Sequence, residues 1–253
     1  MGNLIFNGQS LANLGFVIQT YPSYEIPDKN VEVKTIPGRN GSIIRDTETY
    51  RETVRTYKIA AAIPENKTYI DIGRSVAEWL MTAKGYKRLT DTYDPLVYRM
   101  ARYSDAIELP NLWDQATGAT IQFVCKPQRY LLTGEASVSL SGHAGSWVEV
   151  ENPTKFPASP EFTLTLSSTA STTLDFYAGS TSDPTYASDV VISGVSGEIH
   201  ILSDAMECYN SSGLINDKVT IHAGFPTLYP GKNYIKYPSN VTAISMVPRW
   251  WTL

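Results

Sequence analysis

Cysteine and histidine are scarce in this sequence, which narrows the chemistry open to it. Only two cysteines occur, Cys125 and Cys208, far apart and outside any CxxC pair. We expect both to be buried and reduced, and a single disulfide between them is the alternative. The three histidines, His143, His200 and His222, form no HxH or HExxH spacing and are expected to be hydrogen-bonded structural residues. The sequence therefore predicts neither a metal site nor a cofactor.

Sequence motifs for catalysis and nucleotide binding are also missing. The string Gly194-Val195-Ser196-Gly197 is not a G-x-S-x-G nucleophile elbow, and no GxxxxGK[ST] or GxGxxG loop occurs. The carboxylates that could be paired as in a β-sandwich glycosidase are Glu149, Glu151 and Glu161, or Asp204 and Glu207. Solvation at the surface explains these acids more simply, so we predict that the protein is not an enzyme.

Long apolar runs and a basic surface are absent as well. No stretch of 18 apolar residues exists to span a bilayer, and the N-terminal residues 1–8 lack the charged leader of a signal peptide. The net charge of −4 and the pI near 5.4 give no sign of a basic surface that would bind DNA or a membrane. We expect a soluble protein, made in a cytoplasm, without membrane or sequence-specific nucleic-acid partners.

Charge divides unevenly along the chain and predicts two domains. Residues 1–133 carry 16 Lys and Arg against 14 Asp and Glu, whereas residues 134–253 carry 5 against 11. With 42% apolar residues, either half can bury a core of its own. The predicted boundary therefore lies at 133/134.

A long polar hairpin is the most informative local pattern in the first half. Residues 31–36 partly alternate, and Pro37-Gly38-Arg39-Asn40-Gly41 supplies two consecutive turn signals. A return strand is expected from about Ile43 to Ala60. A two-stranded ribbon is marginal alone in water, so it should lie against its own domain or a neighbouring copy, unless it is a solvated edge hairpin.

One helix is predicted, over about residues 69–84. Thr68 and Asp71 have the spacing of a capping box. The apolar residues Ile72, Val76, Trp79 and Leu80 fall on one face. Gly85, after Lys84, is expected to end the helix.

The remaining pattern is that of short strands. Leu4–Phe6 should form a hairpin through Asn7-Gly8, and residues 97–109 and 119–126 should pair through a connection at 110–118. In the second half, expected strands lie at 162–166, 174–177, 190–192, 198–202, 220–222, 233–237 and 241–247. The predicted fold class is mainly β with one α-helix, with a β-sandwich in the second half.

Several strings, in order, resemble the distal tail protein (Dit) family of long-tailed, non-contractile phages of Gram-positive bacteria. In the first half they are the 37–41 turn, Glu78-Trp79-Leu80, Gly85-Tyr86, the segment 89–95 and Tyr98-Arg99. In the second half they are the segments 197–204, 225–233 and 247–251. The resemblance covers nearly the whole chain, although no single string is decisive.

The resemblance implies a structural hub at the distal end of the phage tail, and so a virion protein. An N-terminal β-sandwich-like domain would form a homo-hexameric ring around a channel for DNA, and a C-terminal galectin-like β-sandwich would project outward. The ring would join the tail tube protein to the tail fibre or tail-associated lysin protein, with room for peripheral baseplate or receptor-binding proteins. The hairpin is the expected ring interface, with candidate residues Gly38, Arg39, Asn40, Gly41, Arg45, Arg51 and Arg55.

A carbohydrate-binding module for adhesion to the host wall is the alternative function. It is suggested by a β-sandwich carrying Trp147, Trp250 and Trp251, because exposed tryptophans can stack on sugar rings. Packing in the core or an interface explains these side chains more simply. The second domain is also too short for the inserted arms or binding modules of some relatives, so the hub function is favoured.

Overall fold

The computed structural model describes residues 2–103, 105–110 and 116–253. The chain divides into two compact units, residues 1–129 with Leu253, and residues 130–252. In the described residues the fold is mainly β with one α-helix, as the sequence predicts.

The described residues of the first unit form nine strands and the helix, and the last strand runs on into the second unit. Its elements are β1 (Leu4–Phe6), β2 (Gln9–Ser10), a 3₁₀ turn (Leu11–Leu14), β3 (Phe16–Ile18), β4 (Lys29–Thr35), β5 (Ser42–Tyr50), β6 (Thr53–Ala62), α1 (Tyr69–Met81), β7 (Lys87–Asp91), β8 (Val97–Arg102) and β9 (Ala116–Leu131).

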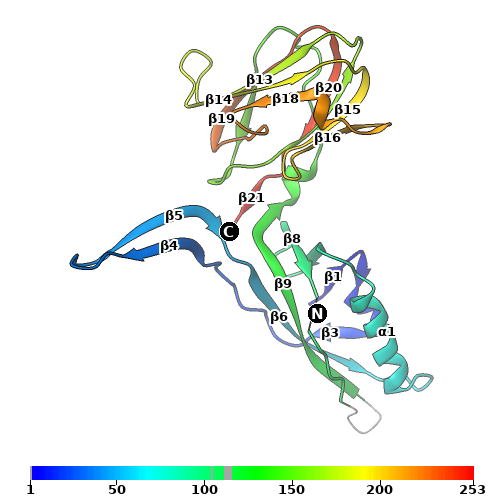
Figure 1. Ribbon diagram of the computed structural model, residues 1–253. Helices are drawn as coiled ribbons and strands as arrows, with labels where there is room; N and C mark the ends of the chain where they lie inside the picture. Colours follow the sequence, from blue (N-terminus) through cyan, green and yellow to red (C-terminus); the bar gives the residue numbers. More distant parts are fainter. Residues whose placement is uncertain (1, 104, 111–115) are drawn as a thin grey trace. The chain divides into compact units, whose positions relative to one another are not determined.

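Seven of these strands form one sheet in the order β2-β1-β7-β8-β9-β6-β3 (Figure 1). The sheet curls on itself, because Ile18 in β3 makes a bridge to Gly2, just before β1. Its inner face encloses an apolar core that includes Leu4, Phe6, Phe16, Tyr57, Ile59, Ile121 and Phe123. The Asn7-Gly8 hairpin is confirmed, since both residues have positive φ, 52° and 79°.

Helix α1 covers this core with the predicted face. The capping box of Thr68 and Asp71 is present, and the four predicted apolar residues are buried. The Trp79 indole also donates a hydrogen bond of 3.1 Å to the Phe6 carbonyl, which ties the helix to β1. The predicted end at residue 84 is wrong: the helix stops at Met81, where the Thr82 hydroxyl donates to the Glu78 carbonyl at 2.6 Å.

The predicted hairpin is confirmed at its turn but ends sooner than expected. Strands β4 and β5 form a separate two-stranded ribbon, which we call the arm (Figure 1). The return strand does not continue to Ala60, because β6 instead pairs with β9 from Thr53 to Ala62. The strand expected over 97–109 also ends early, at Arg102, and part of the 110–118 connection lies outside the described residues.

The second unit contains twelve strands: β10 (Val138–Ser139), β11 (Val148–Asn152), β12 (Glu161–Leu166), β13 (Thr172–Ala178), β14 (Tyr186–Ile192), β15 (Gly197–Leu202), β16 (Glu207–Asn210), β17 (Gly213–Leu214), β18 (Val219–His222), β19 (Gly231–Lys236), β20 (Val241–Val247) and β21 (Trp251–Thr252). Two further 3₁₀ turns lie at Leu132–Glu135 and Asn216–Lys218.

Two antiparallel sheets in this unit share one core, as a β-sandwich requires. Their orders are β10-β20-β12-β15-β16-β17 and β11-β19-β13-β14-β18. Core residues come from both sheets, among them Phe162, Leu164, Phe176, Val190, Ile201, Ile235 and Ile244. All seven strands expected in this half are present. Strand β11 was missed, although Val148-Glu149-Val150-Glu151 alternates as an exposed strand should.

Candidate interaction surface: the arm and its base

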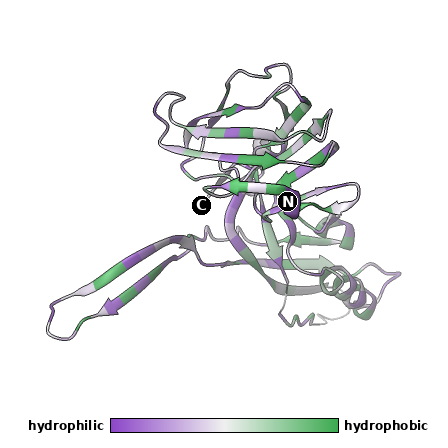
Figure 2. Ribbon diagram, turned by 45° about the horizontal axis from the view of Figure 1, so that its top comes forward, coloured by the Kyte–Doolittle hydropathy of each residue, from purple (hydrophilic) through white to green (hydrophobic). Residues whose placement is uncertain are grey.

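The arm has one apolar face and one charged face. Its register pairs Val33 with Ile44 and Glu32 with Arg45. Because opposed residues share a face and neighbours alternate, Val31, Val33 and Ile44 lie on one side, together with Asp46, which is opposite Val31. Glu32 and Arg45 lie on the other, together with Lys34 and Ile43. Figure 2 shows apolar and polar residues alternating along β4, and an apolar stretch next to a hydrophilic one along β5.

None of the described residues of the first unit covers the apolar face. Val31, Val33 and Ile44 are 44%, 60% and 67% exposed, and every residue of β4 and β5 is exposed or half-buried. Burying an aliphatic side chain of this size contributes about 1.5–3 kcal/mol. The arm therefore has a strong tendency to bury this face against a partner.

The tip of the arm is built by the predicted turn. Gly38 and Gly41 have φ values of 81° and 84°, which residues with a Cβ rarely adopt. A Cβ at either position would meet nothing within 4 Å, so backbone conformation alone selects glycine here. The Arg39 amide donates to the Ile36 carbonyl at 3.2 Å, and Asn40 completes the turn.

The three candidate arginines occupy different environments. Arg45 is exposed on the charged face and lies 3.7 Å from Glu32. Arg51 follows β5 and donates to the Asn30 side chain at 3.1 Å. Arg55 is not on the arm: it lies in β6, is only 4% exposed and is paired within its own unit. Arg55 was expected on the hairpin because the return strand was predicted to be longer than it is. Since its guanidinium is buried and paired, Arg55 cannot bind a neighbouring copy.

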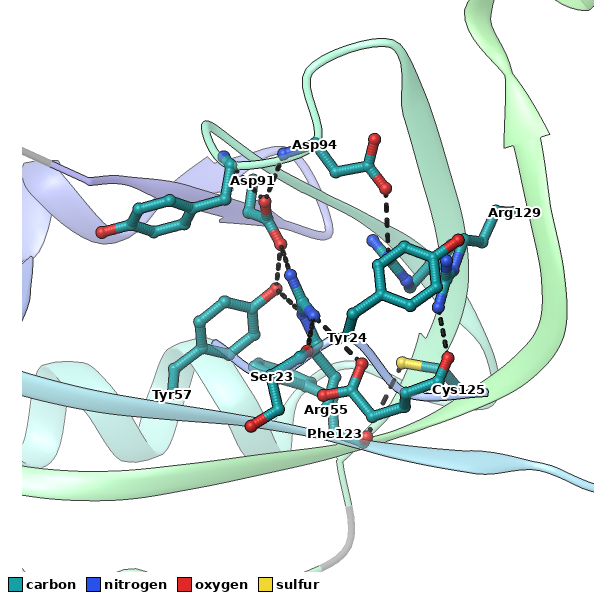
Figure 3. Close-up of polar contacts among 12 residues, drawn as sticks. Ser23, Tyr24, Arg55, Tyr57, Asp91, Asp94, Phe123, Cys125 and Arg129 are labelled. Carbon is teal, nitrogen blue, oxygen red and sulfur yellow. Dashed lines mark hydrogen bonds and ion pairs between the residues drawn. The ribbon is translucent and has the colours of Figure 1, made fainter. Parts of the chain in front are cut away.

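Arg55 instead forms the centre of a buried cluster at the base of the arm (Figure 3). Its guanidinium lies 3.0 Å from both Asp91 and Glu25 and donates to the Ser23 carbonyl. The Tyr57 hydroxyl donates to the same Asp91 oxygen at 2.5 Å. Ser23 and Glu25 belong to the irregular segment that leads into β4, so this cluster fixes the segment to the sheet.

Electrostatics in the cluster favour the charged pair. Burial alone would raise the pKa of Asp91, but the Tyr57 hydroxyl and the Arg55 guanidinium hold it below its usual range. Burial and the adjacent carboxylate of Asp91 raise the pKa of Tyr57, so this hydroxyl stays protonated. The charged and polar groups of the cluster are therefore paired with one another, and none of them is tuned to exchange a proton near neutral pH. We call this cluster the clamp.

A second set of contacts extends the clamp. The Arg129 guanidinium lies 3.7 Å from the centre of the Tyr24 ring and donates to the Glu25 carbonyl. Arg99 pairs with Asp94 at 3.2 Å. Arg55 and Arg129 thus hold the segment that precedes the arm at three successive residues, Ser23, Tyr24 and Glu25.

The residues considered for other chemistry have structural surroundings. The described residues contain no group of three His, Cys, Asp or Glu that could hold a metal. All three histidines are hydrogen-bonded, as predicted: His143 to backbone carbonyls, His200 to Thr163 and His222 to Asp189. A helix with the length and hydropathy of a membrane span is absent from the part of the chain that the structure describes.

Both cysteines are buried and free. Burial raises the pKa of Cys125 to about 12 and that of Cys208 to about 11. Their thiols are therefore protonated at neutral pH and poor nucleophiles.

Two features of the site were missed at the sequence level. The alternation of Val31 and Val33, followed by Ile43-Ile44 after the turn, marks an apolar face, but the charged residues around it suggested a wholly polar ribbon. The partners of Arg55 left no local signal, because Asp91 lies 36 residues away.

Comparison with known proteins identifies the fold. No protein-family model and no curated protein matches the sequence. The structure is similar to SPP1 Dit (gp 19.1), described as a paradigm of the hub adsorption apparatus in phages that infect Gram-positive hosts, with a TM-score of 0.72, 17% identity and 100% of both chains covered. A chain of the phage P2 baseplate in its activated, calcium-bound conformation is similar at a TM-score of 0.51, with 8% identity and 97% of both chains covered. The resemblance drawn from the sequence strings is confirmed in the fold: this chain folds as a Dit protein does.

Proposed function

We propose that the protein is a structural hub subunit of a phage tail tip, acting by assembly rather than by catalysis. Support comes from the fold shared with SPP1 Dit, a hub of the adsorption apparatus, over the whole of both chains. The observation that carries the proposal for this chain is the arm, whose apolar face is uncovered while its base is clamped.

Assembly through the arm follows from these two properties. A ribbon held firmly at its base cannot readily fold back to bury Val31, Val33 and Ile44 on its own unit. Covering them by an identical neighbour gives a heterologous, head-to-tail contact, which closes into a ring when the rotation between copies is suitable. We propose a homo-hexamer in which residues 1–133 build the ring, with the tip residues Gly38, Arg39, Asn40 and Gly41, and the flanking Arg45 and Arg51, at the interface.

The remaining roles concern the partners of the ring. One side would bind the tail tube protein and the other the tail fibre or tail-associated lysin protein, with a central channel for DNA. The near balance of 16 basic and 14 acidic residues in 1–133 suits passage of DNA without retention. The acidic, galectin-like domain over 134–253 would offer a peripheral docking surface for baseplate or receptor-binding proteins. The protein would accordingly reside in the virion, at the distal end of the tail.

Two variants on opposite faces of the arm test this proposal. Val33→Ser with Ile44→Ser removes the apolar face, whereas Lys34→Ser changes an exposed residue on the charged face of the same ribbon. Native mass spectrometry and negative-stain microscopy of the full chain, alone and with the tail tube protein, should show rings for the wild type and Lys34→Ser and monomers for the double variant.

Two results would contradict the proposal. A wild-type protein that stays monomeric at high concentration, even with the tail tube protein, would remove the ring. Rings of unchanged stability in the double variant would show that the apolar face does not form the interface.

A further inference from the structure

The sequence contains two Asn-Gly dipeptides, Asn7-Gly8 and Asn40-Gly41, and the structure places them in different settings. In such a pair the backbone nitrogen of the glycine can attack the side-chain amide carbon of the asparagine, because glycine has no Cβ to hinder the approach. The reaction requires the asparagine to rotate about its Cα–C bond until the two atoms meet. The freedom of each asparagine to rotate therefore decides whether it reacts.

Asn40 is free to make this rotation at the tip of the arm. Asn40 and Gly41 are both exposed, and they lie in the loop that follows Thr35 and precedes Ser42, the last paired residues of the ribbon. In the part of the chain that the structure describes, neither the Asn40 side chain nor the Gly41 amide makes a hydrogen bond. No pairing is therefore lost when Asn40 turns towards the Gly41 nitrogen.

Asn7 is held in place by the hairpin of the first sheet. It is one of only two residues between the paired strands β1 and β2, whose register joins Phe6 to Gln9. Its amide donates to the Arg88 carbonyl at 3.1 Å, and its φ of 52° belongs to the tight turn. Rotation about the Asn7 Cα–C bond would separate Phe6 from Gln9, so the same dipeptide is kept in an unreactive conformation.

We propose that Asn40 is a site of spontaneous deamidation in the unassembled chain. The Gly41 nitrogen loses its proton to solvent base and forms a bond to the side-chain carbon of Asn40. The bond from that carbon to the amide nitrogen breaks, and the nitrogen takes up a proton and leaves as ammonia. Water then opens the five-membered imide at either carbonyl, which gives aspartate or isoaspartate. One water is consumed for each ammonia released, and neither an oxidant nor a cofactor is needed.

Both products change the tip of the arm. Each adds a negative charge beside the exposed Arg39, and isoaspartate also adds one methylene to the backbone of the turn. Because loop length sets the register of a hairpin, the added methylene disturbs the pairing of Thr35 with Ser42. Where the tip is buried in a ring interface, a step that rests on the proposed function, Asn40 cannot rotate and is protected. The modification thus distinguishes free subunits from assembled ones.

Ageing the full chain at mildly alkaline pH, followed by peptide mass spectrometry, tests the proposal. Cleavage after lysine places the two sites in separate peptides, residues 1–29 and 35–58, and chromatography resolves their aspartate and isoaspartate forms. In the monomer isolated by size-exclusion chromatography at low concentration, Asn40 should convert at least about tenfold faster than Asn7. In urea the two sites should convert within about threefold of each other, because the dipeptide is the same.

Two variants complete the test. Asn40→Gln keeps the amide group but would have to close a larger ring, so it should stop conversion at this position and leave Asn7 unchanged. If the wild type yields no monomer, the variant with Val33→Ser and Ile44→Ser supplies one, since both substitutions lie outside the tip.

The inference is overturned if Asn40 in the monomer converts no faster than Asn7, or at least about tenfold more slowly than in urea. In isolated rings, conversion of Asn40 should fall at least about tenfold below the rate in the monomer. An unchanged rate in the rings would overturn the protection by assembly. The hub role is read from ring formation itself, so a wild type that forms no rings would contradict that role and leave the deamidation site standing.

Discussion

Replacing Asp91 by Asn would remove the negative charge at the base of the arm while keeping the size of the side chain. One carboxylate oxygen now accepts from Arg55 at 3.0 Å and from Tyr57 at 2.5 Å. The other accepts from the backbone amides of Tyr93 and Asp94 at 2.9 and 3.0 Å. The amide oxygen of Asn can keep the backbone bonds, but its NH₂ group would face two donors.

The cost follows from the burial of the pair. The Asp91 and Arg55 side chains are 0% and 4% exposed. Removing one partner of such a pair costs about 3–5 kcal/mol, because the other charge stays buried. Glu25 still lies 3.0 Å from the guanidinium, so we expect the low end, about 3 kcal/mol.

Urea denaturation of the full chain, followed by circular dichroism and by the fluorescence of its five tryptophans, measures this loss. Two units give separate transitions in general, so the transition of the first unit must be resolved. With a slope of about 2 kcal/mol per molar urea, its midpoint should fall by about 1.5 M. Glu52→Gln is the control in the same unit: its pair with Arg102 is 40% and 38% exposed and is worth below about 1 kcal/mol. An Asp91→Asn loss no larger than this control would refute the clamp.

The pH dependence of the same contribution has a definite sign. Because the folded pKa of Asp91 lies below its ordinary value near 3.8, its stabilisation is fully present above that value. The stabilisation is lost as the pH falls through the folded pKa. The difference between the wild type and Asp91→Asn should therefore be constant from pH 5 to 7 and shrink below about pH 4. A difference already shrinking at pH 6 would contradict this assignment.

Three further outcomes are expected. Thr68→Ala should cost the first unit about 1 kcal/mol by removing the N-cap of α1, and Thr68→Ser should restore most of it, as denaturation would show. Cys125 and Cys208 should resist iodoacetamide at pH 8 in the native protein and react in urea, because burial raises the pKa values of the two thiols to about 12 and about 11. Rapid alkylation of the native protein, detected by mass spectrometry, would contradict this. Tyr57→Phe should destabilise the first unit by about 1.5–3 kcal/mol, the value of a hydrogen bond to a charged group, and an unchanged denaturation midpoint would argue against that bond.

The helix and the hairpin turns were predictable because their causes are local. A capping box spans three residues, and an apolar stripe repeats within one segment, so Thr68 to Leu80 was read correctly. The positive φ values at Gly38 and Gly41 follow from the same short-range logic. The end of α1 was misplaced because Gly85 is an acceptable C-terminal residue, whereas the helical backbone hydrogen bonds end earlier, with the Thr82 amide donating to the Glu78 carbonyl.

Errors arose where pairing is non-local. Residues 43–60 read as one strand, since nothing in their own sequence says that β5 pairs with β4 while β6 pairs with β9, about sixty residues later. Arg55 looked like one more charge on a polar ribbon for the same reason. Its burial depends on Asp91 and Glu25, which reach it only in the folded unit.

The sequence by itself determined the β-rich class, the single helix, the turns and the short strands of the second half, because propensity, alternation and capping act over a few residues. Only the tertiary structure decided which faces are left uncovered. In the folded protein the apolar face of the arm is exposed and Arg55 is buried. The fold also packs Trp250 and Trp251 while leaving Trp147 with Tyr177 on an outer face. Burial depends on which distant segments meet, and that information is spread over the whole chain.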